Sequence, residues 1–183
     1  MSSLESLKRM QIISSDAYSI GEIIDIRYDP SNWCVTGIRT RTEKSAAKTI
    51  SAGSGKSIVQ IKPSDYVIND VMLMQETLSE LNSVVSQDSD NFPALSFIEG
   101  KKVSSSEGVP LGTVHNVNVD LTMWSVPSIS LKLEKSAYEP LGLKKGLLSK
   151  TVIVIRSEYI QMISEIVSLN QSIVDLRNEI IIE

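Results

Sequence analysis

The sequence contains few of the residue types that usually carry chemistry. Its 183 residues include one cysteine and one histidine, and aromatic residues make up only 5% of the chain. The single cysteine, Cys34, excludes an internal disulfide bond and is typical of a protein in the reducing cytoplasm. One cysteine and one histidine are also too few for a usual structural zinc site. We therefore expect a cytoplasmic protein without a metal or an organic cofactor.

Long apolar runs are also absent. No stretch reaches the ~18 apolar residues that a transmembrane helix needs, and Met1–Lys8 lacks the apolar region of a signal peptide. The content of 42% hydrophobic and 22% charged residues is typical of a soluble globular protein. Isoleucine and valine are plentiful, which favours β-strands.

The chain does have an internal repeat. Residues 105–129 match residues 14–38 at seven of 25 positions without a gap, at an offset of 91 residues. The only two tryptophans, Trp33 and Trp124, fall at equivalent positions. The sequence therefore indicates two copies of one domain, which we place at 1–86 and 97–183 with a polar linker at 87–96. The other identical pairs are Ser14/Ser105, Ser15/Ser106, Gly21/Gly112, Asp29/Asp120, Val35/Val126 and Ile38/Ile129.

Both copies show a pattern of short strands joined by hairpins, followed by helical spacing. This pattern predicts a mainly β protein with two small β-barrels in tandem. Closing each barrel would remove the exposed edges of strands that are rich in isoleucine and valine. The apolar spacing predicts a short amphipathic helix after each barrel, at 74–85 and 169–180. The expected strands are 10–13, 20–28, 33–41, 58–61 and 71–74, then 102–104, 111–119, 124–133, 151–155 and 160–167.

Several repeated residues are expected to build turns and close contacts rather than a site. Asp29 and Asp120 precede hairpin turns, where an aspartate side chain binds the backbone two residues further on. In the first turn, proline presets φ and Asn32 tolerates the left-handed region. Gly21 and Gly112 are expected to permit a bulge or a close approach of the backbone. The tryptophans are expected in the core or at its rim, with an interface hot spot as the alternative.

The candidates for catalysis each occur in one copy only. His115, the only possible general base, corresponds to Ile24, so we expect a half-buried strand residue rather than a catalytic group. Ser54–Ser57 resembles the end of a phosphate-binding loop, but Ile50 replaces the first glycine of that motif. We therefore expect a hairpin tip at this place and predict that the chain is not an enzyme.

Positive charge is concentrated in one equivalent segment of each copy. Residues 39–62 carry a net charge of +5 and residues 130–156 carry +4, whereas the whole chain carries −4 and the remainder therefore −13. Each segment is either a solvated hairpin or a contact for an acidic protein tail, an anionic lipid or RNA. The candidate partner contacts are Arg39, Arg41, Lys44, Lys48, Lys144 and Lys145.

The two predicted helices offer apolar stripes that a small barrel would not cover fully. Such stripes favour association between two copies of the chain, so we expect a homodimer. The candidate dimer contacts are Leu78, Leu81, Ile173 and Leu176.

The repeated residues resemble the PRC-barrel domain. The first copy has Ser-Ser-Asp-x-x-x-Ile-Gly-x-Ile-x-Asp-Ile-x-x-Asp at 14–29, Trp33-x-Val35 in the hairpin, and Ile61-x-Pro63-x-Asp65-x-Val67. The second copy has Ser-Ser-Glu-Gly-x-Pro-Leu-Gly-x-Val at 105–114 and Thr122-x-Trp124, but Arg156 where the first copy has Pro63. Leu-Gly-x-Lys-Lys at 141–145 is similar to the archaeal members of the family.

The resemblance implies a function as well as a fold. Some archaeal PRC-barrel proteins are adaptors in FtsZ-based cell division, where they associate with the membrane-anchoring protein SepF and with other PRC-barrel proteins. The resemblance therefore implies a non-enzymatic adaptor that is cytoplasmic and is recruited to the division site at the membrane. The alternative is a factor for RNA or ribosome assembly, like the C-terminal domain of RimM, that would use the two basic segments.

Overall fold

The structure is a computed structural model that describes residues 1–183 except 50–57, 62–66, 69–70, 87–90, 144–150 and 183. It is mainly β, as the sequence predicts. The chain divides into two compact units, Met1–Ser96 with Asp120–Ser125, and Phe97–Val119 with Val126–Glu183. The segment 91–96, which we expected in a linker, is therefore part of the first unit.

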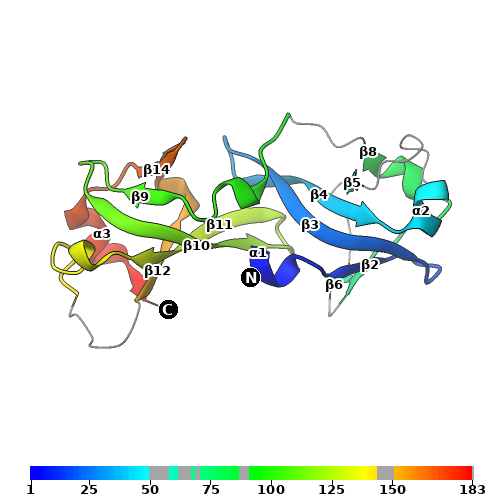
Figure 1. The fold of residues 1–183 in the computed structure, drawn as a ribbon, viewed down its shortest axis with the longest axis horizontal. Coiled ribbons are helices and arrows are strands. Elements are labelled where there is room, and N and C mark those ends of the chain that lie inside the picture. The colour runs from blue at the N-terminus through cyan, green and yellow to red at the C-terminus, as the bar shows by residue number, and fades with distance from the viewer. Residues whose placement is uncertain (50–57, 62–66, 69–70, 87–90, 144–150, 183) are drawn as a thin grey trace. The chain divides into compact units, whose positions relative to one another are not determined.

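The first unit is a curled sheet. Its elements are β1 (Ser2–Ser3), α1 (Leu4–Leu7), β2 (Gln11–Ile13), β3 (Ser19–Asp29), β4 (Cys34–Thr42), α2 (Lys44–Thr49), β5 (Ile58–Ile61), β6 (Val67–Ile68), β7 (Met72–Leu73), η1 (Leu81–Ser83) and β8 (Val85–Ser86). Apart from β1, the strands lie in the order β8-β5-β4-β3-β2-β7-β6, and of these pairings β2 with β7 is parallel. Figure 1 shows β3 and β4 as the long hairpin of this unit. The core packs Ile12, Ile20, Ile23, Ile38, Ala46, Met72, Met74 and Leu81.

The second unit has the same order of strands. Its elements are β9 (Lys102–Ser104), β10 (Pro110–Asp120), β11 (Ser125–Leu133), η3 (Lys135–Ala137), β12 (Val152–Arg156), η4 (Ser157–Tyr159), β13 (Ile160–Ile163), β14 (Ile166–Leu169), α3 (Ile173–Glu179) and β15 (Ile181–Ile182), and η2 (Leu95–Phe97) contributes residues to both units. The order β15-β12-β11-β10-β9-β14-β13 repeats the first unit strand by strand, and the parallel pair, β9 with β14, occupies the same place. The internal repeat of the sequence is thus also a repeat of topology.

Most of the predicted strands are confirmed to within one or two residues, but two predictions are wrong. The segment 160–167, predicted as one strand, is the hairpin of β13 and β14, because the N–H of Ser164 donates to Ile166 O at 2.9 Å and turns the chain. The helix predicted at 74–85 is instead a turn, η1 and β8. In the second copy the helix is present as α3, shorter than predicted because Leu169 belongs to β14.

The segment that follows β7 and β14 nevertheless repeats in detail. The hydroxyl of Thr77 donates to Glu80 Oε2 at 2.8 Å. The equivalent pair at the start of α3 is a capping box, in which the hydroxyl of Ser172 donates to Asp175 Oδ2 at 2.6 Å. A turn after the first strand of each copy adds a second contact. The N–H of Leu78 donates to Asp16 Oδ1 at 3.0 Å, and the N–H of Ile173 donates to Glu107 Oε2 at 3.1 Å. Each trailing segment is therefore fastened to its own sheet.

The repeated glycines allow two backbones to approach closely, as predicted. A Cβ at Gly21 would lie 2.0 Å from Arg41 O, and a Cβ at Gly112 would lie 2.2 Å from Lys132 O. Real Cβ atoms do not approach a carbonyl oxygen so closely, so no other residue fits without moving the facing strand. Gly21 also has a φ of +154°, which side-chain-bearing residues rarely adopt.

The hairpin turns confirm the role predicted for the aspartates. Asp29 Oδ1 accepts the N–H of Ser31 at 2.8 Å, and Asp120 Oδ1 accepts the N–H of Thr122 at 2.9 Å. The left-handed residue of the first turn is Trp33, with a φ of 60°, and not Asn32 as predicted. Its ring stacks on Tyr28, with 5.3 Å between centroids and 17° between planes. The equivalent Trp124 also has a positive φ, of 49°, so the left-handed residue repeats with the turn.

Candidate functional site

The catalytic candidates that the structure describes lie on different strands, Cys34 on β4 and His115 on β10. His115 is exposed on β10, so the expectation of a half-buried residue is wrong. Its counterpart Ile24 lies at a break in the register between β3 and β4, where a strand residue need not face the core. Cys34 is exposed, and Ser54–Ser57 lies outside the described residues. Within the described ranges, no group of three or more His, Cys, Asp or Glu residues could hold a metal ion.

The candidate partner contacts of the first copy lie on β4 and α2. Arg41 is exposed, but its Nη1 lies 2.5 Å from Glu22 Oε1 on the neighbouring strand. Arg39 is half-buried, whereas Lys44 and Lys48 are exposed one turn apart on α2. The candidates of the second copy, Lys144 and Lys145, lie outside the described residues. The structure therefore brings Lys44 and Lys48 together as exposed cations.

The candidate dimer contacts are not exposed. The exposed fraction is 0% for Leu81, 8% for Ile173 and 1% for Leu176, and Leu78 packs partly buried against the first core. The turn closed by Thr77 and Glu80 packs on the sheet of the first unit, and α3 packs on the sheet of the second. These four residues therefore complete the core of each unit. The homodimer stays a prediction, but these four residues do not present an open surface for it.

A buried pair of charged residues on β3 holds the segment 91–96. Asp25 is 6% exposed and accepts hydrogen bonds from the backbone N–H of Ser96 at 3.2 Å and from the Ser96 hydroxyl. Arg27 is 7% exposed, and its Nη1 donates to Phe92 O at 3.0 Å. The N–H of Tyr28 also donates to Pro93 O at 3.2 Å. Sequence reasoning missed this attachment, because nothing in strand periodicity identifies a partner some 70 residues away.

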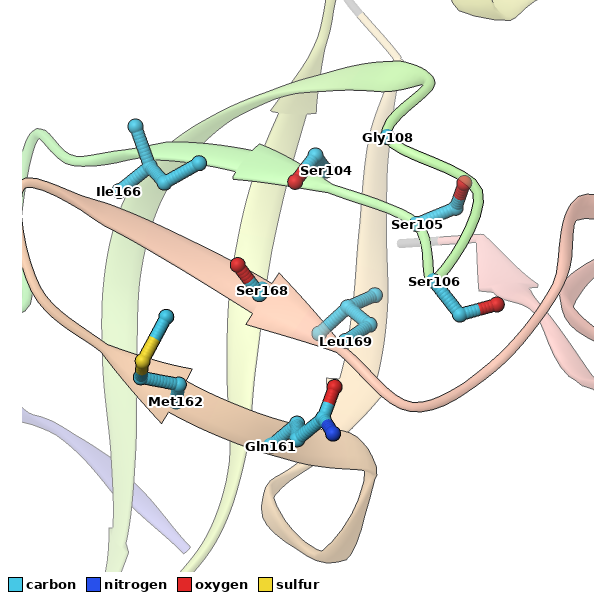
Figure 2. Close-up of a pocket in the computed structure, with 9 residues that line it drawn as sticks. All are labelled: Ser104, Ser105, Ser106, Gly108, Gln161, Met162, Ile166, Ser168 and Leu169. Carbon is cyan, nitrogen blue, oxygen red and sulfur yellow. The ribbon is translucent and has the colours of Figure 1, made fainter.

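A groove of about 600 Å³ lies on the outer face of β9, β14 and β13 in the second unit. Along β14, Val167 and Leu169 are buried while Ile166 and Ser168 alternate outward, as a strand with one covered face requires. Figure 2 shows side chains from all three strands around the groove. Its lining is uncharged and consists of Ser104, Ser105, Ser106, Gly108, Gln161, Met162, Ile166, Ser168 and Leu169.

The register of the three strands explains the shape of the groove. Ser168 pairs with Ser104 on β9 and with Met162 on β13, so these residues form one row across the sheet. The serines are small and half-buried, whereas Met162 is 55% exposed and Ile166 is 40% exposed. The two larger side chains therefore stand beside a low floor made by the two serines (Figure 2).

The equivalent row of the first copy is different. Ile13 and Leu73 pair on β2 and β7 at the positions of Ser104 and Ser168. Gln11 likewise stands at the position of Lys102. The sequence carried this signal, since serine replaces isoleucine and leucine within a repeat, but the strands had to be placed in register before the replacement could be interpreted as a groove.

Comparison with known proteins does not assign the chain to a family. In the described part of the chain, no helix is long and apolar enough to cross a membrane. No model of a known protein family matches the chain, and no curated protein matches it.

Proposed function

We propose that the chain is a non-enzymatic adaptor built from two PRC-type barrel modules. The observation that carries the proposal is the contrast between what the two copies share and what they do not. They share strand order, the close glycine contact, the aspartate turns and the fastened trailing segment. They do not share His115, Cys34 or Ser54–Ser57, the residues that could carry chemistry.

A duplicated scaffold with diverged surfaces suits a protein that holds two partners, or one partner at two places. Two linked binding sites raise the effective concentration at the second site, so tandem modules bind more tightly than either alone. Following the resemblance to archaeal PRC-barrel proteins, we propose SepF and other PRC-barrel proteins as partners, recruitment to the division site as the location, and a homodimer as the assembly.

The second candidate function is binding of RNA. The observation that favours it is the pair of exposed lysines, Lys44 and Lys48, on α2 in the segment with a net charge of +5. Such binding would depend steeply on salt, because each phosphate contact releases counterions. The ion pair of Arg41 with Glu22 weighs against it, since that guanidinium is already engaged.

Co-purification of the tagged full chain from its source cells, followed by mass spectrometry, tests the proposal. We expect SepF or another division protein to be recovered, and its recovery to survive digestion with ribonuclease. A sample prepared with the tag alone is the control. Recovery of no division protein would count against the adaptor, and loss of all partners after ribonuclease would favour the RNA-binding alternative.

A further inference from the structure

We propose that the groove on β9, β14 and β13 binds an extended peptide segment in which an acidic residue neighbours apolar residues. This inference rests on the proposed adaptor function and names the chemistry of one partner.

The shape fits a chain lying on the surface. The volume of about 600 Å³ is within the range of ligand sites. The groove is formed on the outer face of three strands, whereas a small molecule needs a concave site that buries most of its surface. Met162 and Ile166 are exposed beside it and can pack against apolar side chains of a bound segment.

The polar side chains of the groove are free to bind a peptide backbone. The hydroxyls of Ser104 and Ser168 and the amide of Gln161 make no hydrogen bond within the described part of the chain. Hydroxyl and amide groups both donate and accept, so they match the alternating N–H and C=O groups of an extended segment. The hydroxyl of Ser105 is excluded from this set, because it already accepts two backbone N–H groups of its own turn.

The charge favours an acidic residue in the bound segment. None of the nine lining residues is charged. Lys102 is exposed, pairs in register with Ile166 and lies on the same face of β9 as Ser104. Its ammonium has no ion-pair partner within the described ranges, so a carboxylate placed beside Ile166 would find a cation there.

The first copy provides the reason to expect this site in the second copy alone, and it also provides the test variants. Isoleucine and leucine occupy the floor positions there, and glutamine occupies the position of the lysine. The substitutions S104I/S168L and K102Q therefore introduce residues that the same strands already hold in the other copy. They fill the groove or remove its cation while keeping residues suited to the fold.

The experiment selects peptides from a random dodecapeptide phage library on the immobilised full chain and, in parallel, on S104I/S168L. We expect sequences with Asp or Glu beside Val, Ile or Leu to be enriched at least tenfold on the unaltered chain over the variant. The best peptide is then measured by fluorescence anisotropy. K102Q should weaken its binding about threefold, as expected for a partly exposed ion pair, and R9Q, which removes an exposed cation of the first unit, should leave it unchanged.

Each outcome decides the proposal. Equal enrichment on both proteins, or no enrichment, would overturn the groove as the binding site, and peptides without an acidic residue would overturn its charge preference. Thermal unfolding of S104I/S168L is the control that checks whether the variant is folded. If the variant loses the selected peptide but still recovers its partners from cells, the groove is wrong for those partners and the adaptor function stands.

Discussion

Replacing Gly112 by alanine should be among the most damaging single-methyl changes available in this protein. The added Cβ would lie 2.2 Å from Lys132 O and 2.9 Å from Lys132 C. Both are backbone atoms of β11, which is held on its other side by β12 over Ser128–Lys132. The clash therefore cannot be relieved by turning a side chain, and either β10 or β11 has to move.

The size of the effect follows from this geometry. Overpacking a well-formed core costs about 1–3 kcal/mol, and backbone atoms that cannot rotate away place G112A at the upper end, at about 3 kcal/mol. Gly108 is the matched control in the same unit, because its φ is +78° but a Cβ added there would meet no atom within 4 Å. G108A should cost only the strain of the left-handed backbone, about 1 kcal/mol.

Urea unfolding followed by circular dichroism measures both variants against the unaltered chain. G112A should lower the free energy of unfolding by about 2 kcal/mol more than G108A does, with an unchanged m-value for the transition of the second unit. The reasoning would be refuted if G108A were as destabilising as G112A, since backbone strain and not the contact with β11 would then explain both losses.

Three further predictions concern the first unit. D25A leaves the N–H and hydroxyl of Ser96 without their acceptor, so it should cost about 2 kcal/mol and speed protease cleavage within 91–96, which is checked by limited proteolysis. D120A removes the acceptor for the N–H groups of Thr122 and Met123 and should cost about 1 kcal/mol in thermal unfolding, whereas an unchanged midpoint would contradict the turn. Burial raises the pKa of Tyr28 to about 12, so the folded chain holds this proton when the unfolded chain has lost it. Stability should therefore fall as pH rises from about 10 to 12 in the unaltered chain, and fall less in Y28F.

The sequence predicted the elements whose signal is local. β5 and β9 have the expected bounds, and the glycine and aspartate roles are confirmed, because strand periodicity, a missing side chain and an aspartate turn are properties of a few neighbouring residues. The helix predicted at 74–85 is wrong because its signal, apolar residues three to four positions apart, is also local and does not show how the segment packs on the sheet. Leu78 and Leu81 have helical spacing, yet the chain forms a turn and η1 there, with Leu81 buried and Leu78 packed partly buried against the core.

What the sequence could not predict depends on residues far apart in the chain. The attachment of the segment 91–96 depends on Arg27 and Asp25, which bind Phe92 and Ser96 some 70 residues further along the chain. The groove depends on the parallel register of β14 with β9, which places Ser168 beside Ser104. The replacement of isoleucine and leucine by serine is visible in the sequence, but only the pairing of the two serines creates the low floor between larger side chains.

The first unit contains residues from beyond the first copy, and this has a consequence for folding during synthesis. Asp25 and Arg27 are synthesised well before Phe92 and Ser96, the residues that satisfy them, and the unit also includes Asp120–Ser125. A nascent chain that has just released its first copy from the ribosome therefore still has two buried charged groups without these partners. Translation proceeds at ~5–20 residues per second, so this interval is short. We expect the first copy to reach its full set of contacts only while the second copy is being translated.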